Sequence, residues 1–525
     1  MENTSRTKKF LSGVSWLTLS ALAVKVIGLL YKIPLLSYLG TEGMGYFNTA
    51  YELYALFCIV STAGLPVAMA VMISSDETEG GAEKVYRTAR NLFLAVGLFG
   101  SLIMFSFAEQ FAKLLDNSGA AACMRAISPT VLFICLGSAY RGYFQGMGNM
   151  RPTALSQIIE AACKLALGLL LAGYATAKGE SPQAAAAYAV LGLTVGTLLS
   201  STYLSISRRV YRKKHLPHNA FSVEKSGGVL KRLLLLAFPV TLSAVVMGGA
   251  KFVDLAMILS RLARAGFSEA EANSLYGCYS TLVLPIFNML PSLTSSVSLS
   301  AVPALSSALQ KGEGGEGELS DTALTALKLV SYIAIPASIG LSVFAKDILS
   351  LLFSSQPAAV EAAAPWLSVM ALAVLPSCMI TVTTGMLQAM GRAKLSLYSM
   401  LCGILVKTVL AYLLIGKENI GVLGAPVSSV ACDMLVAMLN IRHIAKYCPQ
   451  MLPSGREILN LLVSPALASA AAVGAVKILR GRMQVHTSSF ATVLSILSVM
   501  LVYAALMLVL NLKNIKISER KKYGS

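Results

Sequence analysis

Charged residues are scarce in this chain, making up 13% of its 525 residues, whereas a soluble domain has about 25%. No Gly-x-x-x-x-Gly-Lys-Ser/Thr loop is present, so ATP hydrolysis within the chain is not expected. The nine cysteines show no CxxC or Cys/His spacing and therefore indicate no metal site or redox pair. The four histidines lie outside the long apolar runs, and no Ser/His/Asp set is readable. We expect neither an enzyme nor a resident cofactor.

Hydrophobic residues dominate instead, at 56% of the chain, and the mean hydropathy is +0.69. Apolar runs of about 20 residues recur along the whole length, each long enough to cross a hydrocarbon core of roughly 30 Å. Their length and lack of alternation favour helices over strands. We expect an all-α, multi-pass membrane protein with about fourteen spanning helices. They are predicted at residues 10–36, 45–73, 91–108, 123–145, 153–174, 184–206, 233–260, 273–306, 323–345, 360–390, 397–416, 420–441, 457–479 and 488–511.

Basic residues are distributed unevenly among the segments that connect these helices. If the amino terminus is cytoplasmic, the inside segments hold about three times as many Lys and Arg residues as the outside loops. The positive-inside rule then predicts that both termini lie in the cytoplasm and that the protein spans a bacterial cell membrane. The net charge of +18 is explained by this topology and by contact with anionic membrane lipids. Nucleic-acid binding is not expected.

Two distant segments of the chain match without gaps. Residues 140–171 align with residues 383–414 at a constant offset of 243, which pairs Gly148 with Gly391. Each copy contains a helix, a tight turn with Gly and one basic residue, and a second helix. An even number of helices separates the copies, so both have the same orientation in the membrane. Parallel repeats of this kind occur in secondary transporters, whose binding site lies between two lobes near the membrane midplane.

The repeat predicts how the chain is divided. We expect an N-terminal lobe of six helices over residues 1–215 and a C-terminal lobe of six helices over residues 216–446. Two additional helices and a basic cytoplasmic tail occupy residues 447–525.

A family resemblance rests on two stretches. Residues 142–149 follow the pattern Gly-x-x-Gln-Gly-x-Gly-Asn, and residues 23–54 form the opening stretch. The first resembles the multidrug/oligosaccharidyl-lipid/polysaccharide exporter superfamily, and the second is similar to its stage V sporulation protein B branch. The number of helices resembles the MurJ-type lipid II flippases of the same superfamily. The resemblance implies a V-shaped pair of lobes that moves a polyprenyl-pyrophosphate-linked saccharide from the inner to the outer leaflet. We expect the protein to be a monomer. A cation-coupled multidrug exporter on the same fold is the alternative.

Charged residues inside the predicted helices form the candidate site. Such a charge costs about 2.5–3.5 kcal/mol on insertion scales and usually faces protein or water. Ammonium groups bind phosphate as point charges, so lysines here favour an anionic head group over an organic cation, which would favour carboxylates and aromatic rings. The candidate substrate-binding residues are Lys25, Lys32, Lys164, Lys251 and Lys407.

The acidic residues in these helices are candidates for counter-charges or ion coupling, and they are Glu52, Glu160, Asp254 and Asp433. Glu160 lies four residues before Lys164, the favourable order for a pair within one helix. Lys407, the repeat partner of Lys164, has no such acid, and Asp433 is either its partner or a proton site. Lys251 and Asp254, three residues apart, are either a neutral lock or a coupling site.

The resemblance also bears on particular positions. Lys25 falls where MurJ-type members place a basic residue in the first helix, and its counter-charge is Glu52 or the substrate. These members also place a base in helix 8, where this chain has none. Some use acids in helices 7 and 11 for sodium; Asp254 fits the first, and helix 11 has no carboxylate, so coupling to Na⁺ or H⁺ stays open. We expect substitutions to matter in the order Lys25, Lys407, Lys164, because Glu160 would neutralise Lys164.

Glycine and proline residues inside the helices are candidate hinges, because they interrupt the backbone hydrogen-bond ladder. They are Gly28, Pro34, Pro66, Pro239 and Pro291.

Overall fold

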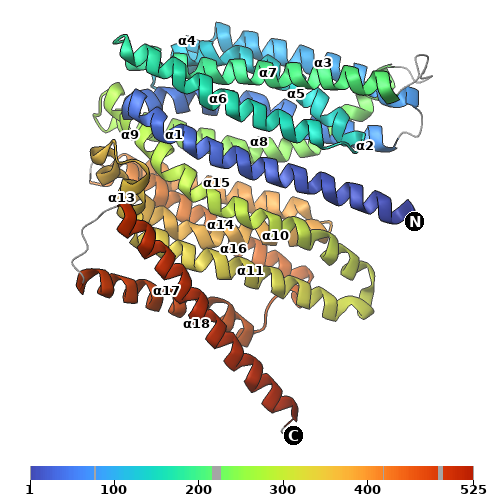
Figure 1. Cartoon of the computed structure of the whole chain (residues 1–525), viewed down its shortest axis with the longest axis vertical. Helices are drawn as coiled ribbons and strands as arrows, with labels where there is room; N and C mark the ends of the chain where they lie inside the picture. Colours follow the sequence, from blue (N-terminus) through green and yellow to red (C-terminus); the bar gives the residue numbers. More distant parts are fainter. Residues whose placement is uncertain (1, 76–78, 216–225, 418, 483–488, 524–525) are drawn as a thin grey trace. The chain divides into compact units, whose positions relative to one another are not determined.

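The computed structural model describes every residue except 1, 76–78, 216–225, 418, 483–488 and 524–525 (Figure 1). Within this described part the regular elements are all helices, and thirteen helical runs are long and apolar enough to cross a membrane. The first run, Leu19–Ser74, has 56 residues, roughly twice the length that one crossing needs. It contains the first two predicted helices, and each other run overlaps one further predicted helix. The all-α, multi-pass membrane fold with about fourteen spans is therefore confirmed.

The long first helix is a hairpin. Helix α1 (Glu2–Thr62) has a non-helical residue at Gly40, where φ is 63°, a conformation that glycine adopts at little cost. The rings of Tyr31 and Phe47, on either side of Gly40, lie 6.1 Å apart. In a straight helix these residues would be about 24 Å apart. The two arms of α1 therefore fold back on each other and account for two spans.

The chain forms two compact units, Met1–Thr281 and Leu282–Ser525. The first unit holds α8 (Ser226–Arg264) and α9 (Glu269–Cys278), which the repeat assigned to the second lobe. The division into lobes at residue 215 stays a prediction.

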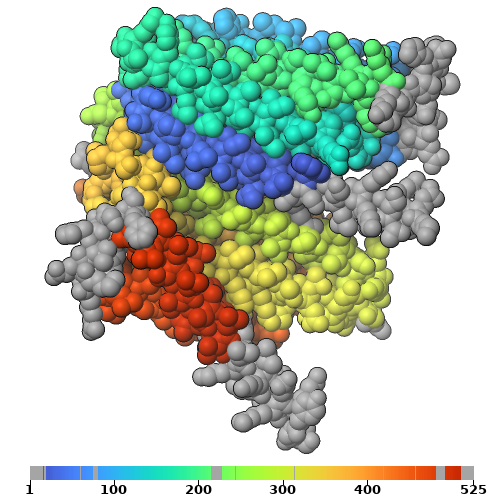
Figure 2. Space-filling view, in the orientation of Figure 1, coloured from blue at the N-terminus to red at the C-terminus, as the bar shows by residue number. Residues whose placement is uncertain are grey.

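The other elements of the first unit are α2 (Gly64–Ser75), α3 (Glu79–Ser106), α4 (Ala108–Leu114), η1 (Ser118–Ala120), α5 (Ala121–Gly146), α6 (Arg151–Ala177) and α7 (Pro182–His215). Helix α6 packs along both α7 and α1, and the space-filling view shows α1 directly beside α6 (Figure 2). Glycine makes the α6–α7 contact possible, because a Cβ on Gly192 would lie 2.3 Å from the backbone nitrogen of Gly168.

Helix α9 begins with a capping box. The Ser268 side chain accepts a hydrogen bond from the Glu271 backbone, and the Glu271 carboxylate accepts one from the Ser268 backbone, which satisfies donors that a helix start leaves open. The helix then lies directly on the second arm of α1. A Cβ on Gly277 would be 2.0 Å from the Thr41 carbonyl oxygen, so only glycine fits at this crossing.

The second unit contains α10 (Leu284–Gln310), α11 (Glu316–Val343), α12 (Ala345–Leu352), α13 (Pro357–Met370), α14 (Val374–Ala389), α15 (Ala393–Ile415), α16 (Gly424–Tyr447), α17 (Gly455–Arg482) and α18 (Ser489–Tyr523). Helix α14 packs against α10 and α16, and α16 packs along α15. The two C-terminal helices attach to this unit through a buried apolar cluster of Phe344, Ala472, Val473, Val476 and Val499.

The internal repeat is visible in the backbone of its two turns. Gly148 and Gly391 have φ values of 70° and 69°. In the first turn, the backbone N–H groups of Gly148 and Asn149 donate to the carbonyls of Gln145 and Phe144. In the second, the residues 243 positions later make the same two bonds. Both turns are Schellman motifs, in which a left-handed glycine ends the helix, so the tight turn predicted for each copy is confirmed.

The α1–α9 crossing can be tested with Gly277→Ala. Because the added Cβ meets backbone, we expect overpacking to lower the free energy of unfolding by roughly 1–3 kcal/mol. Gly249→Ala is the matched control, since a Cβ there meets nothing within 4 Å. Thermal unfolding of the two purified variants checks the difference, and equal midpoints would contradict the close crossing.

Candidate functional site

Five of the predicted charged residues gather in the first unit. The first arm of α1 provides Lys32 and the second arm provides Glu52, while α6 provides Lys164 and α8 provides Lys251 and Asp254. Lys32 interacts electrostatically with Lys164, Glu52 and Lys251, and Glu52 interacts with Lys251, Lys32 and Asp254. We call these five residues the charge cluster. Three ammonium groups against two carboxylates give it a positive formal charge.

The Lys164 ammonium lies among three aromatic rings. Its Nζ is 5.1 Å from the centre of the Tyr31 ring, 5.9 Å from that of Phe47 and 4.9 Å from that of Tyr51. Tyr31 comes from the first arm of α1, and the other two rings come from the second arm. The Lys164 side chain is half-buried. We call Tyr31, Phe47 and Tyr51 the aromatic cage.

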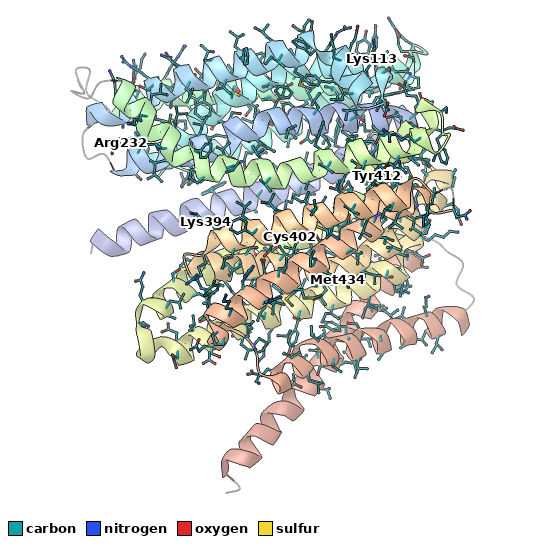
Figure 3. All side chains as sticks on the ribbon, turned by 180° about the vertical axis from the view of Figure 1, so that it is seen from behind. Lys113, Arg232, Lys394, Cys402, Tyr412 and Met434 are labelled. Carbon is teal, nitrogen blue, oxygen red and sulfur yellow. The ribbon has the colours of Figure 1, made fainter. Side chains whose placement is uncertain are left out.

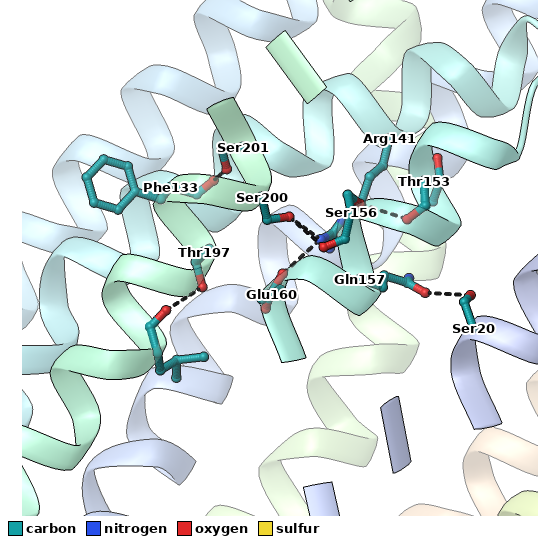
Figure 4. Close-up of polar contacts among 11 residues, drawn as sticks. Ser20, Phe133, Arg141, Thr153, Ser156, Gln157, Glu160, Thr197, Ser200 and Ser201 are labelled. Atoms are coloured by element: carbon teal, nitrogen blue, oxygen red, sulfur yellow. Dashed lines mark hydrogen bonds and ion pairs between the residues drawn. The ribbon is translucent and has the colours of Figure 1, made fainter. Parts of the chain in front are cut away.

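Glu160 forms its ion pair with Arg141 of α5. The Arg141 guanidinium donates to the Glu160 carboxylate at 2.8 Å and to the hydroxyls of Ser156 and Ser200 at 3.1 and 3.3 Å (Figure 4). Both charged side chains are largely buried, at 14% and 19% exposure. A direct ion pair between Glu160 and Lys164 is therefore not found: among the described residues, no carboxylate lies within ion-pair distance of Lys164, and Glu160 acts on it only at longer range.

The aromatic cage solves the electrostatic problem that this leaves. A cation over aromatic faces gains about 2 kcal/mol or more when it is desolvated, which offsets part of the cost of burying an unpaired ammonium. Ring faces attract the charge without cancelling it, whereas a carboxylate would make the site neutral. Lys164 therefore has no ion-pair partner, although Glu160 still interacts with it electrostatically. The predicted order of Lys25, Lys407 and Lys164 stays a prediction.

Lys32 reaches a backbone carbonyl of an irregular helix. Its Nζ donates to the Ser280 oxygen at 3.2 Å. Ser280 belongs to η2 (Tyr279–Val283), a π-helical turn that directly follows α9. Such turns replace the regular i→i+4 ladder and are frequent at functional sites. This contact could not be predicted from sequence patterns, because the two residues are 248 positions apart.

Lys25 lies outside the charge cluster. It is exposed on the first arm of α1, close in sequence to Leu22, Val26 and Leu30, which are also exposed. The electrostatic neighbours of Glu52 are Lys251, Lys32 and Asp254; the predicted partnership of Glu52 with Lys25 is therefore not found. The role of Lys25 in binding stays a prediction.

Lys407 and Asp433 belong to the second unit, on the adjacent helices α15 and α16. Lys407 is half-buried on α15. Figure 3 labels Cys402 and Tyr412 of the same helix. Gly403, one turn before Lys407, stands where the first copy has Glu160. It allows close packing against α16, because a Cβ added there would be 2.3 Å from the Val436 side chain. The binding and coupling roles of Lys407 and Asp433 stay predictions.

A buried polar network joins the second arm of α1 to α9 and η2. Asn48 donates to the Ser280 and Thr281 hydroxyls, each at 2.9 Å. Asn117 donates to Thr49 at 3.0 Å and to Asn273 at 2.8 Å. All six side chains are at most 5% exposed. The network explains why α9 groups with the first unit, and sequence reasoning missed it because uncharged polar residues are unremarkable in a helical sequence.

The helix breaks lie only partly where hinges were predicted. Helix α1 continues through Gly28 and Pro34 and breaks at Gly40. Pro66 follows a second break, since α1 ends at Thr62 and α2 begins at Gly64. Pro239 and Pro291 lie inside the continuous helices α8 and α10. Whether any of the five predicted positions acts as a hinge stays a prediction.

The thirteen apolar helical runs of the described residues define a multi-pass membrane protein, and comparisons with known proteins show its family. The model of the polysaccharide biosynthesis protein family matches residues 10–309, and the model MatE matches residues 280–413. The chain therefore belongs to the polysaccharide biosynthesis protein family, within the multidrug/oligosaccharidyl-lipid/polysaccharide exporter superfamily. The predicted resemblance is confirmed.

Individual relatives extend over most of the chain. Stage V sporulation protein B of Bacillus subtilis (strain 168) is 26% identical over 447 residues, which are 84% of each chain. Lipid II flippase MurJ of the same organism is 24% identical over 481 residues, 87% of each chain. A solved structure of lipid II flippase MurJ in an inward closed conformation has a TM-score of 0.74 at 15% identity, covering 95% of this chain and 99% of that chain.

The Arg141–Glu160 pair provides a stability test. Arg141→Met leaves a largely buried carboxylate unpaired and should cost roughly 3 kcal/mol of unfolding free energy. Adding Glu160→Met should restore much of the loss, because both charges are then gone. The exposed pair of Arg125 and Glu109, at 46% and 58% exposure, is the control and should contribute at most about 1 kcal/mol. Thermal unfolding of the single and double variants gives a double-mutant cycle for each of the two ion pairs. Additive effects of the Arg141 and Glu160 substitutions would contradict the pairing.

Proposed function

We propose that this protein is a flippase that moves a polyprenyl-pyrophosphate-linked saccharide across a bacterial cell membrane, from the inner to the outer leaflet. The observation that carries the proposal is the ammonium of Lys164, which lies in an aromatic cage with no ion-pair partner and gives the charge cluster its net positive formal charge. A buried positive charge without a counter-ion favours an anionic ligand. The pyrophosphate of a lipid carrier supplies such a group, and transport changes its position without any chemical reaction.

The names of the relatives support a flippase. A lipid II flippase and a sporulation protein each match more than four fifths of the chain. Lys32 and Lys164 are the residues that we assign to the pyrophosphate, with Lys251 as a further contact. Glu52 and Asp254 limit the excess of positive charge, so that the head group can also leave. We assign no coupling ion, and the protein acts as a monomer with both termini in the cytoplasm.

The competing proposal is a cation-coupled multidrug exporter, which the MatE match over residues 280–413 favours. Carboxylates and aromatic rings would serve such a ligand, and the first unit has both. The aromatic cage, however, already holds the Lys164 ammonium, and Glu160 is paired with Arg141. The groups that would bind an organic cation are thus engaged by the protein's own basic residues, which favours the anionic substrate.

Binding of farnesyl pyrophosphate, a short polyprenyl pyrophosphate, tests the substrate class. Losing one charge-assisted contact costs about 1.5–3 kcal/mol, so Lys164→Met should weaken binding roughly 10- to 100-fold. Lys164→Arg should retain part of the affinity because the charge persists. Lys113→Met, an exposed position on α4 (Figure 3), is the matched loss of one charge and should bind as the wild type does. Farnesol is the uncharged control ligand.

Calorimetric titration of the detergent-solubilised protein gives these affinities. Two outcomes would sink the proposal: wild-type affinity in Lys164→Met, or equal binding of farnesol and farnesyl pyrophosphate.

The orientation is tested by labelling single cysteines in a Cys-less background of intact cells. Because both termini are proposed to be cytoplasmic, Cys at Glu180, after α6, should react with an impermeant maleimide from outside. Cys at Lys213, near the end of α7, should react only after permeabilisation. Outside labelling at Lys213 would reverse the topology.

A further inference from the structure

The aromatic cage has the composition of a site for organic cations. Three electron-rich ring faces within about 6 Å of one cation are the arrangement that recognises quaternary ammonium ligands. Tyr31 and Phe47 are 1% and 2% exposed, so their faces are shielded from solvent and their attraction for a cation is strong. Here the cation is covalently part of the protein.

The cage keeps its shape through contacts that do not involve Lys164. The Tyr31 hydroxyl donates to the Ala189 carbonyl at 3.5 Å, and its ring packs on Gly168, where a Cβ would lie 2.6 Å from the hydroxyl oxygen. The rings of Phe47 and Tyr51 are stacked, 6.3 Å apart. Removing the lysine side chain therefore leaves the three rings held by their own neighbours.

From this geometry we infer that Lys164 determines the charge selectivity of the protein by permanently occupying a latent site for quaternary ammonium ions. The ammonium end fills the position that a ligand cation would take, between Tyr31 and Tyr51. It also repels any second cation, together with Lys32. The inference rests on the proposed anionic substrate only for its biological meaning; the latent site is a property of the rings.

The formal charge near the cage falls when Lys164 is removed. The charge cluster then holds two lysines and two carboxylates, so its formal charge falls from positive to zero. Glu160, one turn from position 164, stays paired with Arg141, and its charge acts on position 164 only at longer range. We therefore expect the ring faces to provide most of the attraction for a cation in the emptied cage. A cationic probe and a neutral molecule of the same size test this expectation.

The test uses tetramethylammonium as the probe, with tert-butyl alcohol as a neutral molecule of similar size. Lys164→Ala empties the cage and should bind tetramethylammonium, which raises its unfolding temperature with increasing ligand concentration. Wild type should show no such shift. Lys164→Met refills the cage with an apolar chain and should also show none. Adding Tyr51→Leu to Lys164→Ala removes one ring face and should reduce the shift at least severalfold.

Thermal shift reads out binding even in a destabilised variant, and Lys164→Ser provides a second emptied cage if Lys164→Ala is not obtained folded. A response of wild type or Lys164→Met equal to that of the emptied cage would overturn the inference. So would an equal response to tert-butyl alcohol, or none in either emptied variant. Farnesyl pyrophosphate binding to the wild type reports separately on the proposed substrate class, so the two ideas fail independently.

Discussion

An ammonium group buried without a counter-ion is the constraint on which the first unit depends. Moving a charge out of water costs several kcal/mol, and proteins usually meet that cost with an opposite charge. Here the nearest acid on the same helix, Glu160, is held by Arg141, and the ammonium of Lys164 rests against aromatic faces. The aromatic cage also depends on the backbone conformation, because its rings come from both arms of α1 and only the turn at Gly40 brings the two arms together.

Uncharged polar groups hold the rest of this unit together. Asn48, Asn117 and Asn273 link α1, the segment before η1, and α9 through bonds of 2.8–3.0 Å. Each bond contributes only about 0.5–1.5 kcal/mol net, but leaving one of these buried groups unpaired costs about 1–3 kcal/mol. Lys32 connects it to the charge cluster through the Ser280 carbonyl. The charge cluster and the packing of the segment after α9 thus share one residue, Ser280.

The helices and their order could be predicted because membrane crossing imposes a length and an apolar composition that are readable residue by residue. The repeat turns were predictable for a similar reason, since Gly148 and Gly391 mark a backbone conformation that few other residues adopt. The partners of charged residues could not be predicted. The interaction of Glu160 with Arg141 spans 19 positions, and the cage around Lys164 draws on residues more than 100 positions earlier. Spacing rules cover only neighbours on one helix.

The order of the chain gives the aromatic cage a role during synthesis. Both arms of α1, with Tyr31, Phe47 and Tyr51, leave the ribosome before α6 is made, and domains fold from the amino terminus as they emerge. Lys164 therefore enters a membrane in which the three ring faces are already present. An isolated lysine in a spanning helix carries an insertion cost of about 2.5–3.5 kcal/mol. The earlier hairpin offers this late-arriving charge a ready partner and so favours the correct placement of α6 over its slipping toward the membrane surface.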